Sequence, residues 1–179
     1  LLTLINDTIR LSELDMTEKT IEFEDIDLYE LAENCVSMLQ INAEKHQVFL
    51  SLFGSSCPVC ANKGMMEELL YNLCDNALRY TEAGGKVGVT VGKEENEAVI
   101  TVSDTGIGIP PEDLDRVFER FYRTDKSRSK ETGGAGLGLS IVKHAVSYLG
   151  GRISLDSAQG IGTTFKVYLP KDPEDHSDD

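Results

Sequence analysis

Three polar residues recur at one-turn intervals in a segment with an apolar helical pattern. Glu68, Asn72 and Asn76 are spaced at i, i+4 and i+8, beside an apolar series that begins at Leu69. Residues at this spacing share one face of a helix. Because carboxylate and amide oxygens suit Mg²⁺ and its waters, the stripe indicates a metal-binding face. A solvated polar face is the alternative interpretation.

A glycine-rich stretch, TGGAGLGLS at residues 132–140, precedes another apolar helical pattern. Glycines let backbone amides approach a phosphate closely, and a helix N-terminus presents free N–H groups and a positive dipole end. The stretch therefore indicates an anion site, or else glycines that only cap a helix. No Gly-Lys-Ser or Gly-Lys-Thr occurs, which excludes a Walker loop, and the glycine spacing does not match a dinucleotide fingerprint.

Three more motifs accompany these two. Asp104 stands at the end of an apolar strand pattern, and the glycines of DTGIG at residues 104–108 permit a close turn. The FERF motif at 118–121 precedes a polar stretch, and GIGTTF at 160–165 completes the set. A plain turn after the strand is the alternative for the DTGIG motif.

Taken together and in order, these motifs resemble the boxes of sensor histidine kinases. Residues 68–81 resemble the N box, 104–108 the first glycine box, 118–121 the F box and 134–139 the second glycine box. The resemblance spans roughly residues 20–170. It implies the Bergerat ATP-binding fold, which is shared with DNA gyrase, MutL-type ATPases and a heat-shock chaperone.

The resemblance implies ATP and Mg²⁺ as ligands. Asp104 would accept a hydrogen bond from the adenine amino group, because an ionised carboxylate can only accept. Tyr80 and Ile109 would pack on the base. Asn76, with Asn72 close by, would hold the Mg²⁺ that neutralises phosphate charge during phosphoryl transfer.

Other roles follow from the same resemblance. Arg79 and Arg123 resemble phosphate-contacting cations, and residues 122–135 would form a lid that closes on the ligand. The remaining residues implied in nucleotide binding lie in or near the glycine and F boxes: Gly106, Ile107, Gly108, Phe121, Gly134, Gly136, Leu137, Gly138, Leu139 and Thr164. Glu68, Asn72 and Arg79 form the catalytic set, in which Glu68 has a supporting role.

The implied activity is that of a protein-histidine kinase in a two-component system. The γ-phosphoryl group of ATP would pass to a histidine on a dimerisation domain, and then to an aspartate of a response regulator. In the family the acceptor histidine is followed by Glu or Asp, whereas His46, His144 and His176 are followed by Gln, Ala and Ser. The acceptor is therefore expected upstream of Leu1. The expected partners are that domain and a receiver domain, with a homodimeric parent and a monomeric fragment.

The elements that position these motifs follow from periodicity. Helical patterns occur in three long segments and one short one: 28–45, 62–80, 139–149 and 110–118. Apolar alternation predicts strands at 21–24, 47–53, 58–61, 86–92 and 98–104, and a last hairpin over 153–169. Because helices and strands segregate, the fold class expected is α+β: a two-layer α/β sandwich with a mixed, mainly antiparallel sheet packed on three helices.

The resemblance also divides the chain into three segments. Residues 1–18 resemble the end of a dimerisation hairpin helix, 19–171 would be the ATP-binding kinase domain, and 172–179 form an acidic tail expected to be disordered. No apolar run approaches the ~20 residues of a membrane helix, and no signal peptide is present. A cytoplasmic domain of a parent at the inner or plasma membrane is expected.

The composition of the chain disfavours nucleic-acid binding and a zinc site. The chain has 31 acidic and 17 basic residues and a formal charge of −14, which disfavours nucleic acid as a partner. Four cysteines include a lone CxxC at Cys57 and Cys60, for which reduced thiols are the simpler interpretation than a zinc site.

Three other functions share part of this pattern. A conformational ATPase of the gyrase or chaperone type would hydrolyse ATP with Glu68, but those relatives tend to carry Asp where this chain has Asn76. A serine-directed anti-sigma kinase shares the fold but usually lacks a hairpin helix like that expected at residues 1–15. A nonenzymatic nucleotide-binding module is the third.

Overall fold

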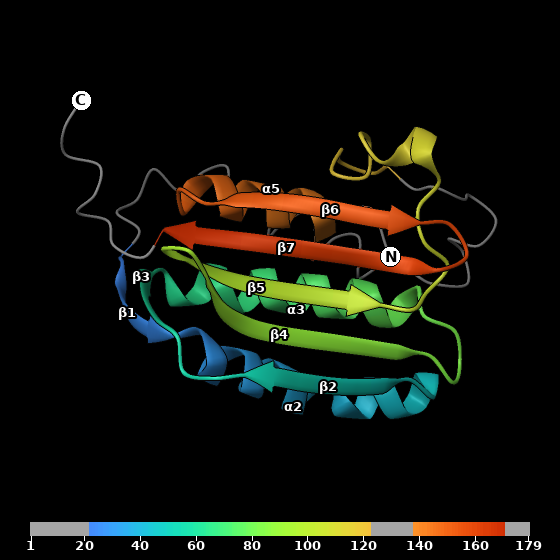
Figure 1. Cartoon of the computed structure of the whole chain (residues 1–179), viewed down its shortest axis with the longest axis horizontal. Coiled ribbons are helices and arrows are strands. Elements are labelled where there is room, and N and C mark those ends of the chain that lie inside the picture. Colours follow the sequence, from blue (N-terminus) through green and yellow to red (C-terminus); the bar gives the residue numbers. More distant parts are fainter. Residues whose placement is uncertain (1–21, 123–137, 171–179) are drawn as a thin grey trace.

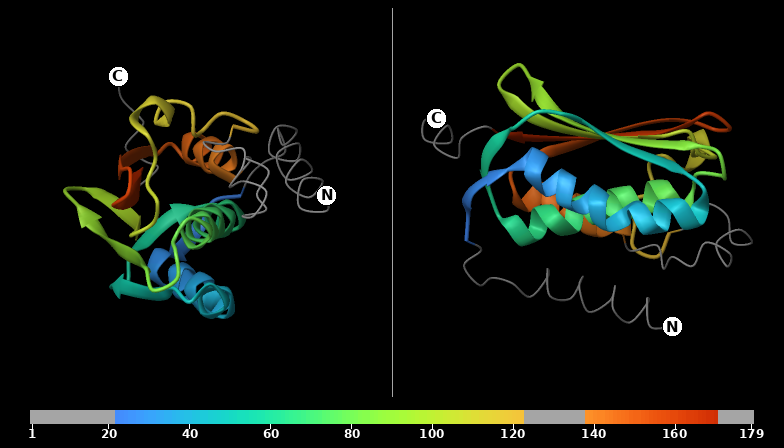
Figure 2. Two further views of the ribbon diagram at one scale, coloured as in Figure 1. Left: turned by 90° about the vertical axis from the view of Figure 1, so that its right-hand side faces the viewer. Right: turned by 90° about the horizontal axis from the view of Figure 1, so that it is seen from below.

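The structure is a computed structural model that describes residues 22–122 and 138–170. The described elements form two layers, a five-stranded sheet and a layer of helices on one of its faces (Figures 1 and 2). Three predicted segments lie wholly or mostly outside the described residues: the hairpin helix at 1–18, the tail at 172–179 and the lid at 122–135. So do four of the implied ligand residues: Arg123, Gly134, Gly136 and Leu137.

Three α-helices lie side by side on the sheet, with α3 between α2 and α5 (Figure 2). Their bounds are Leu28–His46 for α2, Lys63–Arg79 for α3 and Gly138–Tyr148 for α5. Asp27 caps α2 by accepting from the Tyr29 N–H at 2.9 Å, and Asn62 caps α3 by accepting from the Met65 N–H at 2.9 Å. All three predicted long helices are confirmed to within two residues.

The main sheet has the strand order β2-β4-β5-β7-β6, in which only the β2–β4 pair is parallel. Its strands are β2 (Phe49–Gly54), β4 (Lys86–Glu94), β5 (Glu97–Asp104), β6 (Arg152–Ala158) and β7 (Gly162–Pro170). A small antiparallel sheet joins β1 (Glu24–Asp27) to β3 (Pro58–Ala61). The predicted mixed, mainly antiparallel two-layer sandwich is confirmed.

The core lies between the helices and the inner face of the sheet. The inward side chains of β4, Val87, Val89 and Val91, are fully buried, as are Leu69 and Leu73 of α3. This apolar face of α3 is the one that the sequence predicted beside the polar stripe. Burial of the apolar face therefore orients the stripe, because the two faces are fixed to one helix.

No disulfide joins any of the four cysteines, Cys35, Cys57, Cys60 and Cys74. Cys57 is buried and donates to the Gly92 carbonyl oxygen at 3.7 Å. The thiols of Cys35 and Cys74 hydrogen-bond to one another between α2 and α3. Among residues 22–122 and 138–170, no group of three or more His, Cys, Asp or Glu side chains has the geometry of a metal site.

Two local predictions were wrong. The segment from Pro110 to Phe118 is a 3₁₀ turn at Pro111–Asp113 followed by further turns, because most of its hydrogen bonds run from residue i+3 to residue i, as from the Arg116 N–H to the Asp113 carbonyl oxygen. The first strand begins at Glu24, and Ile26 is its buried residue. Within the described ranges, no helix is long and apolar enough to span a membrane.

Candidate functional site

The polar stripe of α3 is half-buried at all three positions, Glu68, Asn72 and Asn76. The Asn72 Nδ2 donates to the Glu68 carbonyl oxygen at 2.8 Å, so the amide nitrogen of the side chain is already engaged. The Asn72 Oδ1 is left as the acceptor on the side of α5, where Gly138 begins the helix. An amide held in this way presents the oxygen that a hard cation requires.

Arg79 continues the stripe, three residues after Asn76. Its Nε lies 2.9 Å from Asp75 Oδ2, in an i,i+4 ion pair with about a quarter of each side chain exposed. Burial raises the pKa of Asp75, and the Arg79 charge offsets part of that rise. Asp75 was missed by the sequence reasoning, although its spacing from Arg79 predicts such a pair.

Asp104 ends β5 with its carboxylate held by two backbone donors. Its Oδ1 accepts from the Gly106 N–H at 2.9 Å, and the Thr163 N–H also donates to the carboxylate. Burial raises the pKa of Asp104, and these two hydrogen bonds lower it by less. The result is an oriented, partly desolvated acceptor, which suits recognition of an amino group.

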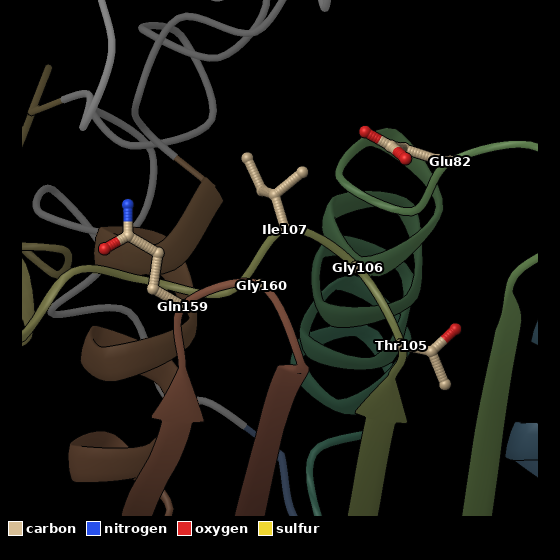
Figure 3. Close-up of a pocket in the computed structure, with 6 residues that line it drawn as sticks. All are labelled: Glu82, Thr105, Gly106, Ile107, Gln159 and Gly160. Atoms are coloured by element: carbon tan, nitrogen blue, oxygen red, sulfur yellow. The ribbon is translucent and has the colours of Figure 1, made fainter.

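The turn after Asp104 is packed between α3 and the β6–β7 hairpin (Figure 3). On one side, the Ile107 N–H donates to the Tyr80 carbonyl oxygen at 3.0 Å, and a Cβ on Gly106 would lie 2.3 Å from that oxygen. On the other side, Gly108 has φ +70°, and its Cβ would lie 2.1 Å from the Ala158 carbonyl oxygen. Both glycines of the DTGIG motif are therefore required by close backbone contact.

A pocket of about 340 Å³ borders this turn (Figure 3). Its lining comes from the turn and from the ends of two neighbouring segments: Glu82, Thr105, Gly106, Ile107, Gln159 and Gly160. Only Gly106 and Ile107 belong to the predicted set, and the stripe of α3 does not line the pocket. The candidate site is therefore defined by Asp104, the turn and the stripe of α3 rather than by this pocket.

The strand register places Thr164, a predicted site residue, on the face of the sheet opposite to that of Asp104. Thr164 lies opposite Ser103, and their hydroxyl oxygens are 2.8 Å apart on the outer face of the sheet. Thr163 lies opposite Asp104, on the inner face, and is buried. Successive strand residues point to opposite faces, so Thr163 rather than Thr164 shares the inner face with Asp104.

The other predicted residues take varied positions. Tyr80 follows the last residue of α3 and is half-buried, and Leu139 packs against the core from α5. Phe121 is exposed over 56% of its surface and has φ 65°. Phe118, which had no assigned role beyond its motif, is the more buried aromatic and packs edge-on against Phe165, with ring centroids 6.1 Å apart.

Residues 62–173 match the family described as histidine kinase-, DNA gyrase B- and HSP90-like ATPases. The chain belongs to this family. The chain is 37% identical over 179 residues to the sensor-like histidine kinase SenX3 of Mycolicibacterium smegmatis. The alignment covers 98% of this chain and 47% of SenX3. It is 36% identical over 181 residues to the sensor histidine kinase WalK of Bacillus subtilis, covering 99% of this chain and 30% of WalK.

Solved structures agree with this assignment. Full-length ShkA in complex with AMPPNP is 27% identical, with a TM-score of 0.82 over 94% of this chain and 35% of ShkA. The mycobacterial sensor histidine kinase MprB is 29% identical, with a TM-score of 0.73 over 84% of this chain and 99% of the MprB chain. This ATPase-family domain spans less than half the length of the curated relatives SenX3 and WalK.

Proposed function

We propose that the chain is the ATP-binding catalytic domain of a two-component sensor histidine kinase. It transfers the γ-phosphoryl group of Mg-ATP to a histidine of the dimerisation domain, from which the group passes to an aspartate of a response regulator. The observation that carries the proposal is the Asp104 carboxylate, held by two backbone N–H donors on the inner face of the sheet. The likeness to sensor kinases supports it along the whole described chain.

Different described residues contact different parts of the nucleotide in this proposal. Asp104 accepts a hydrogen bond from the adenine amino group, and Ile109 and Tyr80 border the base. Asn76 and Asn72 hold Mg²⁺, which supplies charge neutralisation at the phosphates. The donor set fits a hard cation, because both are amide oxygens and the Asn72 nitrogen is already engaged by its own helix.

Arg79 supplies a cation next to the metal-binding face. Its Nε is paired with Asp75, which aims the guanidinium and leaves its other N–H groups for phosphate oxygens. Arg123, Gly134, Gly136 and Leu137 complete the phosphate end by resemblance to the family motifs. Glu68 supports Asn72 through its carbonyl oxygen, and we assign no proton transfer to its carboxylate.

The acceptor histidine belongs to the dimerisation domain. Of the two described histidines, His46 is exposed with its Nδ1 2.7 Å from the Asn42 carbonyl oxygen, and His144 is half-buried on α5. Neither is followed by an acidic residue. We also propose that the parent protein is a membrane-anchored homodimer with this domain in the cytoplasm.

The proposal is tested by phosphoryl transfer to a separate acceptor. The chain is mixed with the dimerisation hairpin of its own parent protein and with γ-labelled Mg-ATP. Acid-labile, base-stable phosphate should accumulate on the hairpin, and Asn76→Ala should abolish the transfer. Normal ATP binding without any labelled hairpin would overturn the kinase function, and steady ATP hydrolysis abolished by Glu68→Gln would favour a conformational ATPase.

A further inference from the structure

Ser157 of β6 joins the turn after Asp104 to the strand that carries Thr163. Its Oγ accepts a hydrogen bond from the Ile109 N–H at 2.8 Å. The same oxygen lies 3.0 Å from the Gly162 carbonyl oxygen and 2.8 Å from Thr163 Oγ1. Ser157 is half-buried, and it is the side chain through which the β6–β7 hairpin bonds to the turn.

These partners determine the directions of the hydroxyl protons. A serine hydroxyl has one proton and two lone pairs. The Ile109 N–H occupies one lone pair, and the Gly162 carbonyl oxygen can only accept, so the Ser157 proton is directed to that carbonyl. Thr163 then donates its own proton to the second lone pair of Ser157, which is the assignment that satisfies every group.

This arrangement commits the Thr163 proton to Ser157 and leaves the lone pairs of the Thr163 oxygen as acceptors. Thr163 lies directly opposite Asp104 in the sheet, on the same face, and its backbone N–H donates to the Asp104 carboxylate. Side chains directly opposite one another on paired strands have Cβ atoms about 5 Å apart. The Asp104 carboxylate and the Thr163 hydroxyl oxygen are therefore two acceptors at neighbouring positions on the inner face of the sheet.

Two neighbouring acceptors distinguish the two common purine types. The 6-amino group of adenine carries two protons and can donate to both oxygens, whereas a 6-oxo group has only lone pairs to present. A buried acceptor that meets another acceptor loses its hydrogen bond to water without replacement. Without Ser157, the Thr163 hydroxyl would be released to donate, and it could then bond a 6-oxo purine.

We propose that Ser157 is a positioning residue for base selectivity: it orders the Thr163 hydroxyl as an acceptor and holds the Ile109 end of the turn. This inference rests on the proposed ATP binding and deepens it, because it names the group that adapts the site to a 6-amino purine. Ser157 itself does not contact the base in this arrangement.

The experiment compares ATP with inosine triphosphate, which has a 6-oxo group. Dissociation constants are measured with Mg²⁺ for the wild type, Ser157→Ala, Ser157→Thr and the control Ser154→Ala, whose serine is exposed on the opposite face of the same strand. For Ser157→Ala we expect ATP binding to weaken about five- to tenfold. Its preference for ATP over inosine triphosphate should fall by a similar factor.

Conservative variants separate positioning from simple stability. Ser157→Thr keeps the hydroxyl. Its ATP affinity and its preference for ATP should therefore lie within about twofold of the wild type, a smaller change than the loss of one hydrogen bond causes. Ser157→Cys keeps the volume but accepts hydrogen bonds weakly, so it should shift the preference in the same direction as Ser157→Ala while the protein stays folded. Ser154→Ala should leave both constants unchanged.

Two results would overturn the inference. One is an unchanged ATP dissociation constant in Ser157→Ala and Ser157→Cys. The other is an equal loss for both nucleotides, which is what a purely structural role predicts. A wild-type protein that binds neither nucleotide would instead contradict the proposed function itself, so the two failures are distinguishable.

Discussion

Gly138, the first residue of α5, lies directly against the Asn72 side chain of α3: a Cβ on Gly138 would stand 3.3 Å from Asn72 Oδ1. The Asn72 amide cannot turn away freely, because its Nδ2 donates to the Glu68 carbonyl oxygen at 2.8 Å. The second glycine box and the N box thus meet at one side chain. Under the proposed function, the position of this side chain decides whether its amide oxygen is available to Mg²⁺.

Substitution of Gly138 should therefore act through the metal. Gly138→Ala adds a methyl group that displaces the Asn72 amide by a few tenths of an ångström, and we expect Mg-ATP to bind about threefold more weakly. The affinity for ATP in the presence of a chelator should change less. Titration calorimetry with and without Mg²⁺ measures both values, and an equal loss in the two conditions would contradict the assignment of Asn72 to the metal.

Gly106→Ala should destabilise the fold. Its Cβ would lie 2.3 Å from the Tyr80 carbonyl oxygen, which cannot move without disturbing the end of α3. Overpacking of this kind lowers the free energy of unfolding by about 1–3 kcal/mol. Urea denaturation measures the loss. Gly88→Ala is the matched control, because nothing lies within 4 Å of its Cβ on β4, and equal denaturation midpoints for the two variants would contradict the packing argument.

The substitution Asp104→Asn should have opposite effects on the stability of the fold and on ATP binding. Burial raises its folded pKa above the ordinary value of 3.8, so the ionised carboxylate destabilises the fold as the pH rises from 3.8 through the folded pKa. Asp104→Asn removes this charge, and its melting temperature at pH 7 should equal or exceed that of the wild type.

The pH dependence provides the check on Asp104. The advantage in melting temperature of Asp104→Asn over the wild type should shrink as the pH falls and should vanish below 3.8, where the wild-type carboxyl is protonated in both the folded and unfolded states. ATP affinity at pH 7 should fall more than about tenfold, because a charged acceptor is lost. A variant that is less stable than the wild type at pH 7 and equally stable at low pH would contradict the assigned sign.

The contribution of Asp27 to folding stability should depend on pH in the opposite direction to that of Asp104. The Ser56 hydroxyl, 2.5 Å from Oδ2, and the Cys57 N–H, 2.9 Å from Oδ1, lower its pKa in the folded state. The stabilisation is therefore complete above the ordinary value of 3.8 and is lost as the pH falls through the lower, folded pKa. Asp27→Ala should lower the free energy of unfolding by about 1 kcal/mol at pH 7, as for other helix N-caps.

Urea denaturation at pH 7 and at pH 3 checks this prediction for Asp27. The difference between Asp27→Ala and the wild type should be smaller at the lower pH. Asp25→Ala is the control, since Asp25 is an exposed residue of the same strand. A difference that stays constant between the two pH values would show that the carboxylate charge is not what stabilises this end of α2.

Local signals were enough to predict most of the fold and part of the site. Asp27 and Asn62 each precede an apolar series with helical period, and each caps the helix that follows. Predicting that Asn72 and Asn76 share one face requires only the geometry of one helix. Predicting the turn after Asp104 requires only its glycines, and the close contact at Gly106 explains why a glycine is needed there.

Features that depend on the pairing of distant strands could not be predicted in this way. The sequence contains two adjacent threonines, and the β5–β7 register puts Thr163 rather than Thr164 beside Asp104. A shift of one residue exchanges the faces of a strand, and no local signal tells the two apart. Ser157 was missed for a similar reason, because a serine in an alternating strand has the pattern of a solvent-facing residue.

The packing of the turn on both sides limits how the protein can be redesigned. Gly106 lies close to the Tyr80 carbonyl oxygen and Gly108 close to the Ala158 carbonyl oxygen, so neither position of the turn has room for a side chain. Under the proposed function, we expect that a variant accepting bulky N6-substituted adenine analogues cannot be obtained by substitution of these two glycines. The room must come from smaller side chains at positions such as Ile109 and Leu139, whose backbones can stay in place.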